Sequence, residues 1–258
     1  MDRMLLILST LAFLGALGHA LASLRRGTWR DSRRHWMPMA AGLLLQTGFL
    51  YLRGQAHGRC PLTNLFEVLI FIGWAIVLIY FVVGANFRLS LLGMFTAPMI
   101  ALLQIISLAL PIDTAGSAPR LEHNAWRELH SAVSLIAYAA FAMACVTGVM
   151  YLVQERMLKR HHIHGLFFQL PPIHELARAI MRMVLCGVLL LSVGLACSWP
   201  LHTPVTDIKL VSAWVVWALY AGMSVVMWRR SLSARRTALL AVLGFVVPVV
   251  SLWWVTKA

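Results

Sequence analysis

The chain has 258 residues, of which 60% are hydrophobic and only 12% are charged. Soluble globular domains carry about twice that charged fraction, so the composition excludes a soluble protein and indicates one whose surface faces lipid. The apolar runs are continuous, which favours transmembrane helices over a β-barrel, because barrel strands alternate apolar and polar side chains. We therefore predict an all-α, polytopic membrane protein whose single integral membrane domain covers residues 1–258.

Eight apolar runs come close to the roughly 20 residues that a helix needs to cross a bilayer. We predict transmembrane helices over residues 4–24, 36–53, 62–83, 89–110, 126–153, 179–199, 209–228 and 237–256. Because eight crossings return the chain to the side on which it began, both termini are expected on the same side of the membrane.

The net charge of +13 is distributed unevenly along the chain. If the N-terminus lies outside, most of the 22 lysines and arginines fall in the inner loops, as the positive-inside rule requires. These loops are residues 25–35, 84–88, 154–178 and 229–236. The basic excess therefore places both termini on the outer side. It also argues against nucleic acid as a partner and makes the lipid bilayer the expected one.

The four cysteines form no CxxC pair, so the sequence supports neither a zinc site nor a thioredoxin-like motif. Cys60 and Cys197 are both expected near the outer face, where a disulfide between them is one alternative. Cys145 and Cys186 are expected to be small apolar residues inside helices.

The predicted helix over residues 126–153 begins with an indole and an imidazole on one face. Trp126 and His130 are four residues apart, at the outer edge of the span. One interpretation is that both are interfacial anchors, and the other is that the imidazole faces a ligand. Further along, Ala140, Ala144 and Gly148 recur every four residues and predict a face for close helix packing. The neighbouring stripe of Ser134, Tyr138 and Phe141, which continues from His130, is expected to form a mildly polar, exposed face of the same helix.

Glu67 lies close to the outer end of the predicted helix over residues 62–83, three residues after Asn64. This spacing fits a capping box, in which the two side chains satisfy free amides at the start of the helix. It equally fits a carboxylate that faces an internal cavity and pairs with Arg59 or another outer-side base. The two interpretations are compatible and both are kept.

The segment from Trp199 to Tyr220 covers the predicted outer loop 200–208 and the first half of the helix that follows it. It contains His202, which is expected on the same side of the membrane as His130. Two imidazoles from different segments are what bis-histidine ligation of a haem iron requires, with His57 and His123 as competitors for the second position. Aromatic side chains would cover the macrocycle, and Arg120 or Arg127 could meet its propionates.

Several ordered motifs resemble the cytochrome c assembly (CcsA/CcmC-type) family of haem-handling membrane proteins. The segment "NAWRELHSAVSLIAYAAFAMACVTGVMYLVQE" is similar to the one that carries the family's first outer haem-ligating histidine. "CPLTNLFEVLIFIGW" is similar to the family's PLxNxYE-like helix entry. "LPPIHELARAIMRMVLCGVLLLSVGLACSW" and "DIKLVSAWVVWALY" resemble the two helices that follow. The likeness covers roughly residues 60–230.

The loop between the last two motifs departs from the family pattern. Haem-presenting members carry a Trp-rich signature there, and this shorter loop keeps only Trp199, Asp207 and Lys209 in similar places. A histidine expected in the following helix is replaced by the run Ala221, Gly222 and Met223. The eight-helix form without the full signature resembles the HemX/YpjD branch of the family.

The resemblance implies a haem-handling accessory protein of a bacterial cytoplasmic (inner) membrane, acting in cytochrome c assembly or haem biogenesis. His130 and His202 are the expected axial ligands of the haem iron, and Trp126, Trp199, Glu67 and Arg127 are expected to shape the site. Other assembly or haem-synthesis proteins are the expected partners. The sequence carries no paired catalytic carboxylates, nucleophile elbow or phosphate-binding loop, which favours a binding role over catalysis.

Two alternatives remain from the residues alone. A small-molecule or ion transporter is suggested by Glu67 within a predicted span, although other membrane-embedded charges are few. A structural partner of a tetrapyrrole-synthesis enzyme is suggested by the basic inner loop 154–178.

Overall fold

Helices make up most of the computed structural model, which describes residues 2–26, 33–62, 64–87, 92–110, 124–160, 172–201, 207–229 and 232–257. In chain order these are α1 (Asp2–Arg26), α2 (Arg33–His57), α3 (Leu65–Phe87), α4 (Leu92–Ala109), α5 (Ala125–Lys159), α6 (Ile173–Ser198), the short 3₁₀ helix η2 (Trp199–Leu201), α7 (Ile208–Arg229), α8 (Ala234–Gly244) and α9 (Val246–Lys257). No β-strand occurs among the described residues, so the predicted all-α fold is confirmed.

Within these residues, seven helical segments are long and apolar enough to cross a membrane. They include the pair α8 and α9, which together form one span over Ala234–Trp254. The chain is therefore a multi-pass membrane protein. The predicted span over residues 36–53 lies in α2, which is helical over 25 residues but falls outside these seven. Its apolar stretch contains Gln46 and Arg53, whose polar groups bond to α3.

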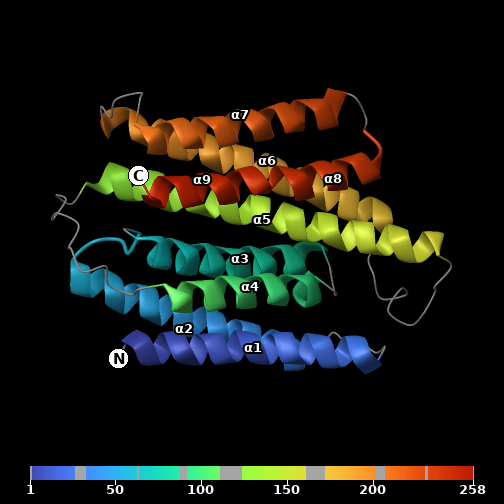
Figure 1. Cartoon of the computed structure of the whole chain (residues 1–258), viewed down its shortest axis with the longest axis horizontal. Coiled ribbons are helices and arrows are strands. Elements are labelled where there is room, and N and C mark those ends of the chain that lie inside the picture. Colours follow the sequence, from blue (N-terminus) through green and yellow to red (C-terminus); the bar gives the residue numbers. More distant parts are fainter. Residues whose placement is uncertain are drawn as a thin grey trace.

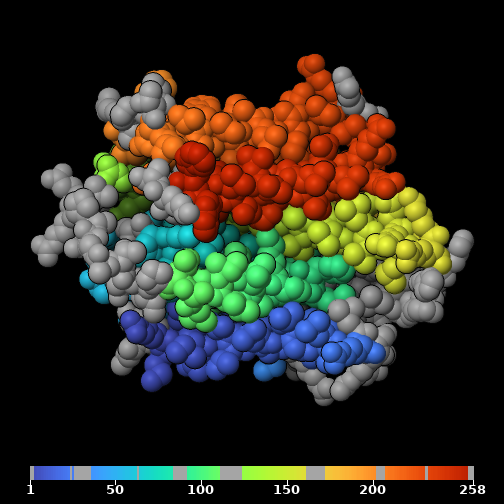
Figure 2. All heavy atoms as spheres, in the orientation of Figure 1, coloured from blue at the N-terminus to red at the C-terminus, as the bar shows by residue number. Residues whose placement is uncertain are grey.

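The helices run lengthwise through the molecule in two groups, with α5 between them (Figure 1). Helices α1 to α4 lie on one side of α5, and α6 to α9 lie on the other. In the space-filling view, α4 and the C-terminal helices cover much of α5, whose C-terminal part remains visible at one end (Figure 2). α5 has 35 residues, which makes it about 52 Å long and longer than the hydrocarbon core of a bilayer, about 30 Å.

Both termini lie at the same end of the bundle (Figure 1). The opposite end holds the ends of α1, α5 and α7 and the starts of α6 and α8 (Figure 1). These parts of the helices carry most of the basic residues whose side chains are described, namely Arg25, Arg156, Lys159, Arg160, Arg178, Arg182, Arg229, Arg235 and Arg236. We refer to the end that carries the termini as the outer end, following the positive-inside rule.

The small-residue stripe of α5 packs as predicted. Ala140 and Ala144 are buried, and a Cβ added to Gly148 would lie 3.0 Å from the main-chain oxygen of Ala238 in α8. The neighbouring stripe differs from the prediction. Ser134, Tyr138 and Phe141 are also buried, because α6, α7 and α9 cover that side of α5. α5 is therefore a central helix and has no exposed polar face along this stripe.

The turn between α2 and α3 is closed by local hydrogen bonds at both of its ends. Gly58 has φ +62°, and the amides of Gly58 and Arg59 bond to the carbonyls of Gln55 and Gly54, which is a Schellman motif. On the other side, the Asn64 side chain accepts a hydrogen bond from the amide of Glu67 at 2.8 Å. The predicted cap at the start of α3 is thereby present.

Candidate functional site

His130 lies in the second turn of α5, at the outer end of the bundle. Asn124 caps the helix by accepting a hydrogen bond from the amide of Trp126 at 3.0 Å. The Nδ1 atom of His130 lies 2.7 Å from the main-chain oxygen of Gly194 in α6. A carbonyl oxygen only accepts hydrogen bonds, so Nδ1 must carry the proton and donate it. In the neutral imidazole, Nε2 then keeps its lone pair.

The contact between His130 and Gly194 depends on a close approach of α6 to α5. A Cβ added to Gly194 would lie 2.5 Å from Oγ of Ser134 and 3.3 Å from its amide nitrogen. Two turns earlier on α6, a Cβ added to Gly187 would collide with the ring of Phe141. The two glycines therefore form a smooth strip along α6, and this strip lets the Gly194 carbonyl reach the imidazole.

Several exposed tryptophans belong to helix ends at this outer end. Trp126 is half exposed, one turn before His130, and Trp199 in η2 is 87% exposed. Trp214 lies in the second turn of α7 and packs edge-on against Trp217 with 5.6 Å between ring centroids. Arg127 is exposed in the first turn of α5. Trp126, Arg127 and Trp199 thus belong to the helix ends that meet near His130.

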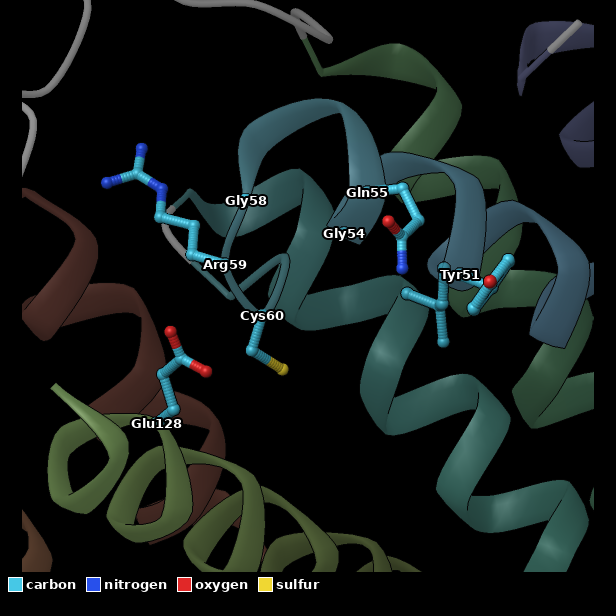
Figure 3. Close-up of a pocket in the computed structure, with 8 residues that line it drawn as sticks. Tyr51, Gly54, Gln55, Gly58, Arg59, Cys60 and Glu128 are labelled. Atoms are coloured by element: carbon cyan, nitrogen blue, oxygen red, sulfur yellow. The ribbon is translucent and has the colours of Figure 1, made fainter. Parts of the chain in front are cut away.

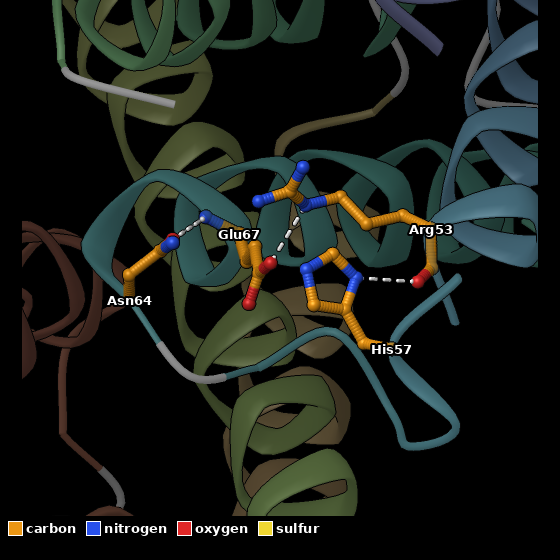
Figure 4. A network of polar contacts seen from close by, with 4 residues as sticks. All are labelled: Arg53, His57, Asn64 and Glu67. Carbon is orange, nitrogen blue, oxygen red and sulfur yellow. Dashed lines mark hydrogen bonds and ion pairs between the residues drawn. The ribbon is translucent and has the colours of Figure 1, made fainter. Parts of the chain in front are cut away.

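Glu67 belongs to a separate group of side chains between α2 and α3 (Figure 4). Its Oε1 lies 2.7 Å from Nε of Arg53, and the carboxylate side chain is only 2% exposed. The Arg53 guanidinium also lies over the Phe66 ring, 5.7 Å from its centroid. His57 Nδ1 donates to the carbonyl oxygen of Arg53 at 2.9 Å and so helps to close the end of α2. Glu67 therefore takes part both in the cap of α3 and in a buried ion pair. The outer-side base that pairs with it is Arg53 instead of Arg59.

A shallow hollow of about 450 Å³ lies between the end of α2 and the start of α5. Tyr51, Gln55, Arg59, Cys60 and Glu128 supply polar groups to its lining. Figure 3 shows Cys60 between Glu128 on one side and the α2 side chains on the other. Sequence reasoning did not find this hollow, because its lining comes from residues far apart in the chain and from an otherwise unremarkable turn.

The Cys60 thiol lies outside the membrane-spanning helices. Burial raises its pKa above the ordinary value, and the charges of Glu128 and Glu67 raise it further. The thiol therefore stays protonated at neutral pH. Cys60 and Cys197 are both free, so the alternative of a disulfide between them is wrong.

The structure does not bring all the predicted site residues together. His202, the predicted second axial ligand, lies outside the described residues, as do His123 and Arg120. Among the residues that are described, no group of three or more His, Cys, Asp or Glu side chains could hold a metal ion. The described part of the site is therefore one imidazole with a fixed tautomer, on a helix that carries the exposed Trp126 one turn earlier.

Comparison with known proteins gives a family match over most of the chain. The family model for cytochrome c assembly protein matches residues 62–256. The chain is 29% identical over 176 residues to Protein HemX of Brevibacillus brevis, covering 66% of this chain and 65% of that protein.

Two similar proteins are both named cytochrome c biogenesis protein CcsA. The one from Chlorella vulgaris is 34% identical over 111 residues, covering 42% of this chain and 35% of that protein. The one from Synechococcus sp. (strain CC9605) is 27% identical over 240 residues, covering 81% and 79%. The matched part thus spans less than two thirds of the HemX and Chlorella proteins.

Proposed function

The chain belongs to the cytochrome c assembly protein family, and from that premise we propose that it binds haem at the outer end of its bundle and handles it during cytochrome c assembly. The membrane is a bacterial cytoplasmic membrane in this proposal. The expected partners are haem and the other proteins of the assembly system.

The hydrogen bond between His130 and Gly194 is the observation that carries this proposal. Histidines that ligate metals usually donate their other ring N–H to a carbonyl or carboxylate, which fixes the tautomer and the ring orientation. Nδ1 of His130 makes such a bond at 2.7 Å, which leaves the Nε2 lone pair available, so this imidazole would hold the haem iron. The residues present therefore fit haem ligation through His130.

The other residues of the outer end are assigned supporting roles. The exposed indoles of Trp126 and Trp199 offer apolar surface for a flat macrocycle, and Arg127 offers a guanidinium for a propionate. Haem, when bound, supplies the iron coordination and the visible absorption, and the protein supplies the ligand and its surroundings. Glu67 keeps the α2–α3 turn in place through Arg53 and is not assigned a contact with haem.

A visible spectrum tests the proposal directly. The full chain is purified from cells supplied with haem, and its Soret absorption per mole of protein is compared with that of His130→Ala. The control is His174→Ala. The His174 side chain is 67% exposed and belongs to the first turn of α6, at the opposite end of the bundle. We expect His130→Ala to lose most of the band and His174→Ala to keep it. Equal bands in all three proteins, or no band in any, would refute the proposal.

A further inference from the structure

Tyr220 places a hydroxyl in the interior of the bundle. Its side chain is 0% exposed, and its Oη has no hydrogen-bond partner among the described residues. The ring stacks on Phe141 with 3.6 Å between centroids and 14° between planes. Phe141 fills the space that Gly187 leaves open on α6. Because this stack holds the ring, it also holds the hydroxyl oxygen in place.

Gly244 lies close to this hydroxyl, at the break between α8 and α9. α8 ends at Gly244 and α9 begins at Val246, with Pro248 inside α9. The carbonyl of Gly244 would ordinarily accept a helical hydrogen bond from residue 248, but proline has no N–H to donate. A Cβ added to Gly244 would lie 3.9 Å from Oη of Tyr220 and 3.1 Å from Sδ of Met223.

The break is held against α5 by a short chain of hydroxyl groups. Ser251 donates to the carbonyl oxygen of Pro248 at 2.8 Å, so its own proton is already used. The contact of 3.2 Å between Tyr138 and Ser251 must therefore be a donation from the Tyr138 hydroxyl. This arrangement ties α9 to α5 shortly after the break.

We propose that a water molecule is bound at this break, accepting a hydrogen bond from Tyr220 and donating one to the Gly244 carbonyl. Water can satisfy a donor and an acceptor at once, and the Tyr220 hydroxyl makes no direct hydrogen bond to that carbonyl. Unpaired polar groups are costly at membrane depth, and ordered water is one of the ways in which broken helices satisfy their freed carbonyls. The soft Met223 sulfur next to Gly244 disfavours a hard cation there.

The sign of a stability change tests this site. Tyr220→Phe removes the hydroxyl and leaves the water and carbonyl short of a partner, so the unfolding midpoint of the full chain in detergent should fall by about 2–4 °C. If the hydroxyl were simply unpaired, the same substitution would leave the midpoint unchanged or raise it, and the proposal would fail. Tyr138→Phe is the matched control, because it removes a hydroxyl with a known partner and should lower the midpoint in either case.

A second substitution tests whether the Gly244 carbonyl takes part in the water bridge. Pro248→Ala supplies an amide that can close the helical bond to Gly244, so the loss caused by Tyr220→Phe should shrink by at least half in that background. An undiminished loss would contradict the bridge. A high-resolution map of the wild-type chain gives an independent check that needs no variant. It should show water density about 2.7–3.2 Å from both oxygens, and a map of that quality without such density would overturn the proposal.

Discussion

The imidazole of His130 in α5 donates a hydrogen bond of 2.7 Å to the main-chain oxygen of Gly194 in α6. The two residues are 64 positions apart in the sequence, and only the packing of α6 on α5 brings them together. This bond decides which ring nitrogen is available to a ligand. Any change that moves α6 away from α5 at Gly194 should therefore change the chemistry of His130.

Gly194→Ala is expected to separate α5 from α6 at this point. The new methyl group would lie 2.5 Å from Oγ of Ser134, so the helices must shift or the hydroxyl must move. Overpacking of this kind costs about 1–3 kcal/mol of folding free energy. The measurement is the unfolding free energy of the purified protein, together with the ¹⁵N NMR shifts of the His130 ring, which report the protonated nitrogen. An unchanged ring spectrum would contradict the assigned hydrogen bond.

Ser134→Ala should relieve that collision. With Oγ removed, the next nearest atoms to the new methyl group are the Ser134 amide nitrogen at 3.3 Å and the His130 carbonyl oxygen at 3.5 Å. Ser134 Oγ has no hydrogen-bond partner in the described part of the chain, so its removal alone should cost little. We expect Gly194→Ala/Ser134→Ala to be more stable than Gly194→Ala. Equal stability of the two would mean that another contact governs the distance between the helices.

The ion pair between Arg53 and Glu67 should be strongly coupled. Both side chains are buried, so Glu67→Gln or Arg53→Met breaks the pair and keeps one of its charges buried. Loss of one partner of a buried pair typically costs about 3–5 kcal/mol. The double variant removes both charges and should be less destabilised than the sum of the two single variants. Additive losses in a double-mutant cycle would rule out the coupling.

The reactivity of Cys60 should depend on Glu128. Maleimides react with the thiolate, and the raised pKa of Cys60 keeps that form scarce at neutral pH. Glu128→Gln removes one negative charge and therefore lowers the pKa, so labelling at pH 8 should become faster. It should not reach the rate of a fully exposed thiol, because burial is the larger cause of the shift. A slower or unchanged rate would show that the Glu128 charge does not act on the thiol.

Composition and periodicity were sufficient to predict the helical membrane fold and a close-packing face that includes Gly148, although not that α8 is the helix that packs there. They could not predict the burial of the stripe beneath His130, because the polarity of Ser134 and Tyr138 suggested an exposed face. Burial there depends on α6 and α9, and the hydroxyl of Tyr138 is satisfied by Ser251. A stripe pattern on one helix does not reveal which distant helix covers it.

The site was predictable in part. The spacing of Asn64 and Glu67 identified the cap of α3, but the partner of Glu67 was expected among several bases, and only the geometry of the turn selects Arg53. This pairing also weakens the transporter alternative, which rested on Glu67 as a membrane-embedded acid. The role of Gly194 was not visible in the sequence, because its contact is made by a main-chain oxygen that every residue possesses.

Rescue with free imidazole tests the central proposal most directly. In His130→Gly purified with haem, the Soret band should be lost or shifted, because the nitrogen proposed to bind the iron is gone. Added imidazole can occupy the space left by the side chain and should restore the wild-type spectrum, whereas an equal concentration of pyrrole, which lacks a basic nitrogen, should not. A His130→Gly protein whose band matches the wild type before any addition would contradict His130 as a ligand of the haem iron.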